Sequence, residues 1–210
     1  MGIHCRDQIK EITSSLGQTE HADKSPKLPM SPSHSNHHRR TLMFPSPSFP
    51  SSFLHVVDAD IVSDTCQNAA QRDTTLNLNF CLKVLGEDPK SHSTDLQGLG
   101  IISLNLILNN ATNIGSRIVG LLNDQTVAPD VKKGLKICQD EYSEASSSTK
   151  EAIDAFNSKD YDTTNIYVSG AKDSSSDCED GFKGLKSPLT AENNSFFQLT
   201  AIVLSITNMF

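Results

Sequence analysis

Three shortages limit what this sequence can encode. It contains no tryptophan, only 6% of its residues are aromatic, and apolar residues make up 36% of the chain. That share stays below the usual value of about 45–50% even when the 11 glycines are added. No apolar run reaches the roughly 18–20 residues that a membrane-spanning helix requires. We therefore expect no membrane partner, and we expect part of the chain not to fold.

Proline and histidine are scarce beyond residue 59, and this difference divides the chain into two parts. Residues 1–59 contain six of the nine prolines and six of the seven histidines. In residues 22–52, proline and serine leave no periodic apolar face, which is typical of disorder. We therefore predict a disordered extension over residues 1–59 and one folded domain over residues 60–210. The folded part is long enough to bury a hydrophobic core.

The charge of the folded part and its lack of catalytic motifs argue against two classes of function. Residues 60–210 carry 12 basic and 20 acidic side chains, whereas a nucleic-acid-binding protein needs a basic face. They contain none of the short motifs of P-loop, dinucleotide-binding, serine hydrolase or zinc protease sites. Their single histidine, His92, lies in an expected loop, and the cluster Asp140, Glu141 and Glu144 is typical of a solvated helix face. We expect neither nucleic-acid binding nor catalysis.

Metal and other cofactors are not expected either. His34, His37 and His38 are close together, but they lie in the extension and have no neighbouring carboxylate. The cysteines show no C-x-x-C spacing, which disfavours a zinc site.

The end of the extension has the layout of a secretory signal peptide. Two consecutive arginines precede a moderately apolar stretch that ends at Val57-Asp58-Ala59. The residues at positions −3 and −1 would allow cleavage before Asp60. We predict a degenerate signal peptide over about residues 43–59, an upstream extension over residues 1–42, and a secreted protein that begins near Asp60.

Four segments of the folded part repeat apolar or small residues at alternating steps of three and four, the spacing of helices in a bundle. They are residues 104–121, 131–156, 168–185 and 196–210. Asp95 is the expected start of the first helix, Pro129 lies near the start of the second, and Thr190–Asn193 are the expected cap of the last. Shorter helical stretches at 61–71 and 76–86 precede them. These patterns predict an all-α fold, an up-down-up-down four-helix bundle preceded by a short helical hairpin.

Five cysteines are present, and four of them lie in the folded part. Cys5 belongs to the extension, whereas Cys66, Cys81, Cys138 and Cys178 form an even set, as in secreted domains with two disulfides. In an antiparallel hairpin, residues equally distant from the turn face each other. The midpoint of residues 138 and 178 falls at a predicted turn over residues 158–162, and that of residues 66 and 81 falls between the two short helices. We therefore predict the pairs Cys66–Cys81 and Cys138–Cys178.

The folded part contains two sequons for N-linked glycosylation, which fit a secreted protein. They are Asn110-Ala111-Thr112 and Asn193-Asn194-Ser195. Because Ala111 belongs to a predicted core stripe, Asn110 lies beside that stripe, and we expect Asn193 to be the better acceptor.

The disulfide-clipped hairpin, followed by a bundle with one cysteine in its second helix and one in its third, resembles the plant invertase and pectin methylesterase inhibitors. Three stretches are particularly similar to the invertase inhibitors described as plane-tree pollen allergens, namely DPKSHSTDLQGLG (88–100), CEDGFKG (178–184) and SPLTAENNSFFQLTAI (187–202). The resemblance covers residues 60–210. It implies an apoplastic protein that blocks the active site of a cell-wall or vacuolar invertase in a one-to-one complex. The alternatives are a pectin methylesterase inhibitor and a non-inhibitory secreted bundle of the pollen-allergen type.

The resemblance also implies a region of contact with the target enzyme, formed by Lys159, Asp160, Tyr161, Asp162 and Thr163. Invertase inhibitors of the family carry a Pro-Lys-Phe tripeptide near the start of the third bundle helix, where this sequence has Tyr161-Asp162-Thr163. We expect an exposed turn held rigid from behind by Cys138–Cys178. Tyr161 is the expected anchor, because tyrosine is enriched at binding hot spots. The flanking aspartates would be repelled by the carboxylates of an invertase cleft, so we expect weak inhibition of invertase.

Overall fold

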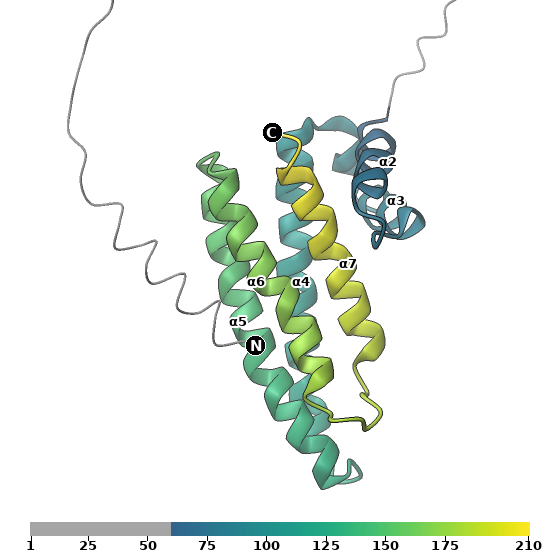
Figure 1. Cartoon of the computed structure of the whole chain (residues 1–210), viewed down its shortest axis with the longest axis vertical. Coiled ribbons are helices and arrows are strands. Elements are labelled where there is room, and N and C mark those ends of the chain that lie inside the picture. Colours follow the sequence, from purple (N-terminus) through teal and green to yellow (C-terminus); the bar gives the residue numbers. More distant parts are fainter. Residues whose placement is uncertain (1–59) are drawn as a thin grey trace, which may run out of the picture. The chain divides into compact units, whose positions relative to one another are not determined.

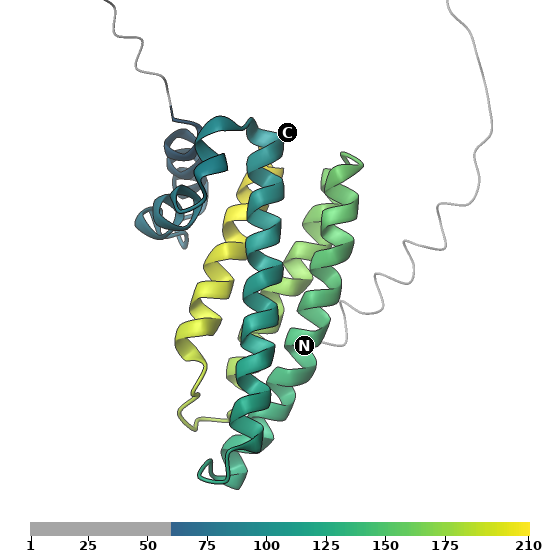
Figure 2. The same cartoon turned by 180° about the vertical axis from the view of Figure 1, so that it is seen from behind.

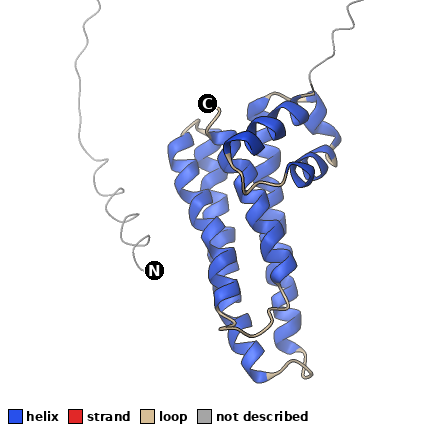
Figure 3. Cartoon of the chain, turned by 45° about the vertical axis from the view of Figure 1, so that its right-hand side comes forward, coloured by secondary structure: helices blue, strands red, loops and turns tan. Residues whose placement is uncertain are grey.

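The computed structural model describes residues 60–210, and within this part every regular element is helical (Figure 3). The predicted disorder of residues 1–59, the signal peptide, Cys5 and the three clustered histidines all lie outside the described residues. In chain order the elements are α2 (Ile61–Arg72), α3 (Leu78–Gly86), the 3-10 helix η1 (Pro89–Ser93), α4 (Leu96–Asn123), α5 (Pro129–Asn157), α6 (Tyr161–Asp180) and α7 (Thr190–Thr207).

Helices α4, α5, α6 and α7 form the predicted four-helix bundle. α4 packs along α5, α5 along α6, α6 along α7 and α7 along α4, which closes the bundle (Figures 1 and 2). The stripe predicted for α5 faces the core, where it buries Leu135, Cys138, Tyr142, Ala145, Thr149, Ala152 and Phe156. The fold class predicted from the sequence is therefore confirmed. Among the described residues, none of the helices combines the length and apolarity needed to cross a membrane.

The hairpin of α2 and α3 packs beside the start of α4 and the end of α7. Its Cys66 and Cys81 are joined by a disulfide with a Cα–Cα distance of 5.7 Å. The buried apolar side chains of the hairpin share one cluster with Leu99 of α4 and Ile202 of α7. The hairpin is thereby fastened to the bundle on the side opposite α5 (Figure 1).

Short polar side chains determine where most of the helices begin. An oxygen of the N-cap side chain accepts a hydrogen bond from a backbone N–H of the first turn, as at Asp60, Asn77, Asp95 and Asp160. Helix α5 instead has Pro129 in its first turn, where the missing N–H costs nothing. The helix starts predicted at Asp95 and near Pro129 are thus confirmed.

The predicted end of α6 is wrong. The helix ends at Asp180 and not near Leu185, and Gly184 lies in the loop that follows with a φ of +85°, a conformation that glycine adopts without strain. Phe182 maintains the apolar spacing from outside the helix, because its ring is buried against Gly134. A Cβ at Gly134 would lie 2.6 Å from that ring, so only glycine leaves room for it. Leu185 is 47% exposed and does not belong to the core.

The predicted cap of α7 is also wrong. This helix begins at Thr190, with Leu189 at the N-cap position and no side-chain hydrogen bond to its first turn. The residues expected to cap it, Thr190–Asn193, therefore form its first turn. At its other end the helix stops at Thr207, so Phe210 lies beyond it.

Candidate functional site

The turn between α5 and α6 consists of three exposed residues, Ser158, Lys159 and Asp160. Lys159 has a φ of +61°, the left-handed conformation that commonly ends helices. The N–H of Asp160 donates to the carbonyl of Ala155 at 2.9 Å, and its carboxylate accepts from the N–H of Thr163 at 3.0 Å. The turn is short, and hydrogen bonds hold it at both of its ends.

Tyr161, the predicted anchor, is half-buried and held by three contacts. Its ring stacks on Phe210 with centroids 4.2 Å apart and an interplanar angle of 9°. It also meets Phe156 edge-on at 5.3 Å. Its hydroxyl donates to Oε1 of Gln97 at 2.8 Å, and Gln97 in turn donates to the carbonyl of Phe156 at 3.1 Å. Tyr161 therefore forms part of the base of the turn and does not project freely from it.

Helix α4 makes room for this aromatic base at Gly100. A Cβ at that position would lie 2.2 Å from Cζ of Phe156, which is fully buried. The glycine thus allows the ring of Phe156 to approach the α4 backbone closely.

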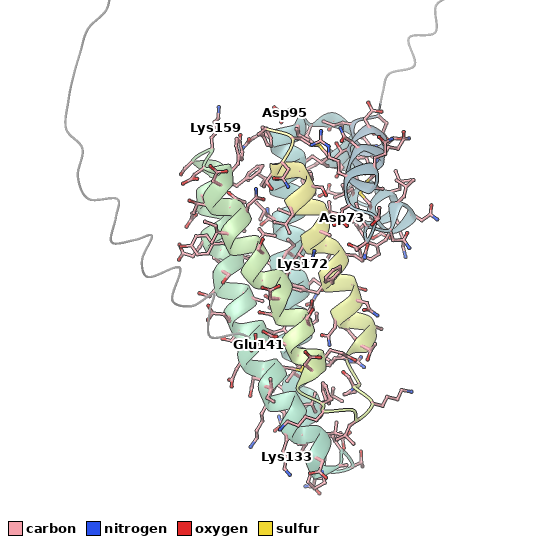
Figure 4. All side chains as sticks on the ribbon, viewed as in Figure 1. Asp73, Asp95, Lys133, Glu141, Lys159 and Lys172 are labelled. Carbon is pink, nitrogen blue, oxygen red and sulfur yellow. A yellow bond between two sulfur atoms is a disulfide. The ribbon has the colours of Figure 1, made fainter. Side chains whose placement is uncertain are left out.

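The C-terminal segment closes one side of the turn and leaves a hollow there, which we call the turn hollow. Its volume is about 360 Å³, and it is lined by residues 159–162, Asn165, Thr207, Asn208 and Phe210. Asp162 and Asn208 are exposed, and Thr163, the last of the predicted contact residues, is half-buried. The Nδ2 of Asn165 donates to Oδ1 of Asn208 at 3.1 Å, which joins the two helices across the hollow. Lys159, which lines the hollow, lies at the same end of the bundle as Asp95 (Figure 4).

The charge around the turn is mixed, with an excess of negative charge. The pKa of Asp160 lies below its ordinary value, because the N–H of Thr163 donates a hydrogen bond to the carboxylate. Asp160 is therefore ionised at neutral and mildly acidic pH. Together with Asp162 it outweighs the single ammonium group of Lys159. This region suits ligands that offer hydroxyl groups or positive charge.

The prediction that Cys138–Cys178 holds this turn from behind is wrong. The disulfide is present, with a Cα–Cα distance of 4.4 Å. However, Cys138 lies in the early part of α5 and Cys178 near the end of α6, so they close the open end of the hairpin. At 1.5 Å per residue, the disulfide is about 30 Å from the turn. The aromatic contacts of Tyr161, and not the disulfide, support the turn.

The prediction that Asn193 is the better glycan acceptor is also wrong. Asn193 is 4% exposed; its Oδ1 accepts from the hydroxyl of Tyr142 at 2.7 Å, and its Nδ2 donates to Glu179 at 2.7 Å. A glycan attached to this buried Nδ2 would have no room unless the Asn193 side chain left its packed position. Asn110 lies in the middle of α4, half-buried, with its Oδ1 buried and without a hydrogen-bond partner in the described part of the chain.

The other singled-out side chains are not among the residues that line the turn hollow. His92 is exposed in η1, with Nδ1 3.0 Å from Oδ1 of Asp60. Asp140 and Glu144 are exposed on α5, and Glu141 lies near the middle of the bundle (Figure 4). Within residues 60–210, no group of three His, Cys, Asp or Glu side chains is arranged to hold a metal ion.

Sequence reasoning missed the residues that complete the site. Gln97 and Phe210 contact Tyr161, yet they lie 64 and 49 positions from it in the chain. No local pattern marks them, because their role follows from how the ends of α4 and α7 meet the turn. The one sequence feature that could have indicated this contact is the apolar spacing that ends at Phe210, which the sequence pattern assigns to the last helix.

Comparison with known proteins agrees with this architecture. The family model described as "Plant invertase/pectin methylesterase inhibitor" matches residues 60–206. A protein from Platanus orientalis named "Putative invertase inhibitor" is 47% identical over 165 residues, which are 77% of this chain and 96% of the relative. The "Pectinesterase inhibitor" of Actinidia deliciosa is 33% identical over 152 residues, 71% of this chain and 78% of the relative.

A solved structure is similar as well. The crystal structure of a mutant form of a pectin methylesterase inhibitor from Arabidopsis matches with a TM-score of 0.60 and 33% sequence identity, covering 69% of this chain and 97% of that one. The agreement of sequence, disulfides and helical architecture has one consequence: this chain belongs to the plant invertase/pectin methylesterase inhibitor family.

Proposed function

We propose that this chain is a secreted protein that binds a plant invertase one-to-one and blocks its active site. The observation that carries this proposal is the difference in similarity between two groups of relatives. The two Platanus proteins named "Putative invertase inhibitor" are 47% and 48% identical to the chain, whereas the Actinidia "Pectinesterase inhibitor" is 33% identical.

The turn between α5 and α6 supports this proposal as the contact region, with residues Lys159–Thr163 at its centre. It is exposed, and its backbone is fixed by the hydrogen bonds of Asp160 and by the ring of Tyr161 beneath it. A segment that is ordered before binding loses little conformational entropy when it enters a cleft. A protein that inhibits by blocking a cleft needs such an ordered, exposed segment and needs no catalytic groups of its own.

Two observations support secretion. The disulfides Cys66–Cys81 and Cys138–Cys178 are stable in an oxidising compartment and not in the cytosol. The first described residue, Asp60, caps α2 with its own side chain, so cleavage before it would leave the folded part complete. We propose the cell wall as the location, residues 43–59 as a signal peptide, and residues 60–210 as the inhibitor domain.

A second candidate target is pectin methylesterase. It is favoured by the departure at Tyr161-Asp162-Thr163 from the tripeptide of the invertase inhibitors. It is also favoured by the similarity to the solved structure of a pectin methylesterase inhibitor. A third alternative is a secreted bundle that inhibits neither enzyme.

Inhibition assays with the full chain, produced through a secretory route so that its disulfides form, distinguish these candidates. We expect inhibition of invertase that is weak in the natural chain and at least about tenfold stronger after Asp162→Lys and Thr163→Phe together, because the repelling carboxylate is removed while Tyr161 still supports the turn. The matched control changes Asp140→Lys, which alters charge on an exposed face of α5 away from the turn. Inhibition of pectin methylesterase alone would overturn the proposed target, and inhibition of neither enzyme would overturn the proposed function.

A further inference from the structure

The turn hollow combines aromatic and polar side chains that blocking an enzyme does not by itself require. Two aromatic rings, Tyr161 and Phe210, stand beside Asp160, Asp162 and Asn208. The volume of about 360 Å³ is at the small end of the range found for small-molecule sites. A hollow of this size and composition could therefore hold a small molecule with both apolar and polar groups.

The aromatic part of the hollow is ordered in advance. Phe210 stacks on Tyr161 at 4.2 Å and meets the buried Phe156 edge-on at 5.8 Å. It is nevertheless 52% exposed, so much of its surface faces solvent. An aromatic ring that is fixed yet exposed offers an apolar platform at low entropic cost.

The polar part of the hollow has both hydrogen-bond acceptors and hydrogen-bond donors that are free to bind a ligand. Among the described residues, the Asp162 carboxylate makes no hydrogen bond or ion pair, whereas the Asp160 carboxylate caps α6 through Thr163. The side-chain oxygen of Asn208 accepts from Asn165, which leaves its Nδ2 as a donor. The Lys159 ammonium is exposed and adds further donors. Carboxylates accept hydrogen bonds, and amide and ammonium nitrogens donate them.

Charge narrows the class of ligand. The carboxylates of Asp160 and Asp162 outweigh the one ammonium of Lys159, so the hollow has a net negative charge, which repels phosphates and sugar acids. A purely apolar ligand would leave the aspartates without partners. A neutral sugar fits both parts, because its C–H groups pack on an aromatic ring and each hydroxyl both donates and accepts.

We propose that the turn hollow binds one neutral sugar unit, with the sugar ring against Phe210 and its hydroxyls hydrogen-bonded to Asp162 and Asn208. The hollow shares residues 159–162 with the proposed enzyme contact, so a bound sugar and a bound enzyme compete for the same surface. This competition rests on the proposed function, whereas the sugar binding itself does not.

The test is a titration of the isotope-labelled full chain with glucose, sucrose and galacturonate, followed by the backbone amide signals in NMR. No enzyme is present, so the result is independent of whether the chain inhibits one. We expect saturable shifts at residues 159–165 and 207–210 for the neutral sugars. Half-saturation on the order of 1–10 mM is expected, because a single sugar unit offers few atoms.

Four variants assign the binding to the two parts of the hollow. Asp162→Ala and Phe210→Leu are each expected to weaken binding at least about fivefold, and Phe210→Tyr is expected to retain it. Phe197→Leu is the matched control, because Phe197 lies on α7 and its ring contacts Lys172 away from the turn. Saturable shifts that Asp162→Ala and Phe210→Leu abolish would support the proposal. The absence of saturable shifts up to about 50 mM, tighter binding of galacturonate, or shifts confined to other residues would each overturn it.

Discussion

The two ends of the α5–α6 hairpin are held by different chemistry. The open end is joined covalently by Cys138–Cys178, and a buried hydrogen bond from Tyr142 to Asn193 lies beside it. The turn end has no covalent link and rests on aromatic contacts around Tyr161. A disulfide acts mainly by restricting the unfolded chain, whereas ring contacts fix the geometry of the folded turn. In this hairpin, the disulfide at the open end stabilises the fold, and the aromatic contacts at the turn end hold the proposed contact surface.

The largest expected effect comes from opening the covalent end. Cys138→Ser together with Cys178→Ser should lower the free energy of unfolding by about 4 kcal/mol, because the disulfide closes a loop of 40 residues. The variant that remains folded should keep its inhibition, since the turn is supported locally. Denaturant unfolding and the inhibition assay measure the two properties separately.

Removal of the other disulfide is the control for that comparison. Cys66→Ser with Cys81→Ser opens a loop of 15 residues and should cost about 3 kcal/mol. Loss of inhibition in a folded Cys138/Cys178 variant would show that the two ends of the hairpin are not independent.

The turn end can be disturbed from α4. Gly100→Ala places a Cβ where the ring of Phe156 lies and should lower the free energy of unfolding by about 1–3 kcal/mol. It should also weaken inhibition, because Phe156 supports Tyr161. Gly115→Ala is the control: it lies in the same helix with nothing within 4 Å and should stabilise by up to about 1 kcal/mol. Equal effects of the two substitutions in unfolding experiments would contradict the packing argument.

A pair of tyrosines compares the hydrogen bonds at the two ends. Tyr142 is buried, and burial is the main reason why the pKa of its hydroxyl is raised. Tyr142→Phe leaves Oδ1 of Asn193 without its donor in the core and should cost about 1–3 kcal/mol. Tyr161→Phe frees a half-exposed Gln97 that water can reach, so its cost should be below about 1 kcal/mol. Unfolding curves that reverse this order would contradict the contrast between the two ends.

The smallest effect is expected outside the hairpin, at the exposed pair His92 and Asp60. The hydrogen bond between them raises the pKa of His92 and lowers that of Asp60. The contribution of His92 is complete below its ordinary pKa of 6.5 and is lost as pH rises through the raised value. That of Asp60 is present above 3.8 and is lost as pH falls through the lowered value. The pair therefore acts mainly in mildly acidic solution.

An NMR titration of the His92 ring measures this pair directly. Asp60→Asn should return the pKa of His92 toward its ordinary value, and Asp64→Asn, an exposed neighbour on α2, should leave it unchanged. The same pKa in the natural chain and in Asp60→Asn would contradict the assignment of the cause.

The helices and the two cysteine pairs were predictable because they follow from local spacing. The stripe from Leu135 to Phe156 has the period of a bundle helix, and all of its inner positions are buried. The cysteine pairs required only that each pair flank one turn. The apolar spacing predicts the wrong end for α6, because Phe182 continues the pattern although it lies in a loop. The predicted end at Leu185 is five residues beyond the observed end at Asp180.

The environment of the site depended on contacts between distant parts of the chain, which spacing does not encode. The sequence indicates a free anchor at Tyr161 because its partners are distant in the chain: Gln97 lies in the first turn of α4 and Phe210 lies after α7. Asn193 looked like a surface acceptor because its partner Tyr142 lies on another helix. The prediction that Cys138–Cys178 supports the turn is wrong because the two cysteines are equally distant from the turn in the chain but both are about 20 residues away from it.

Hydrogen exchange of the full chain, alone and with invertase, locates the surface that contacts the target enzyme. If the α5–α6 turn is this surface, exchange becomes slower on binding at residues 156–165 and 207–210 and stays unchanged at the open end around Cys138 and Cys178. A parallel measurement with pectin methylesterase identifies the target. Protection confined to the open end of the hairpin, or to the outer face of α4, would show that the enzyme does not contact the turn.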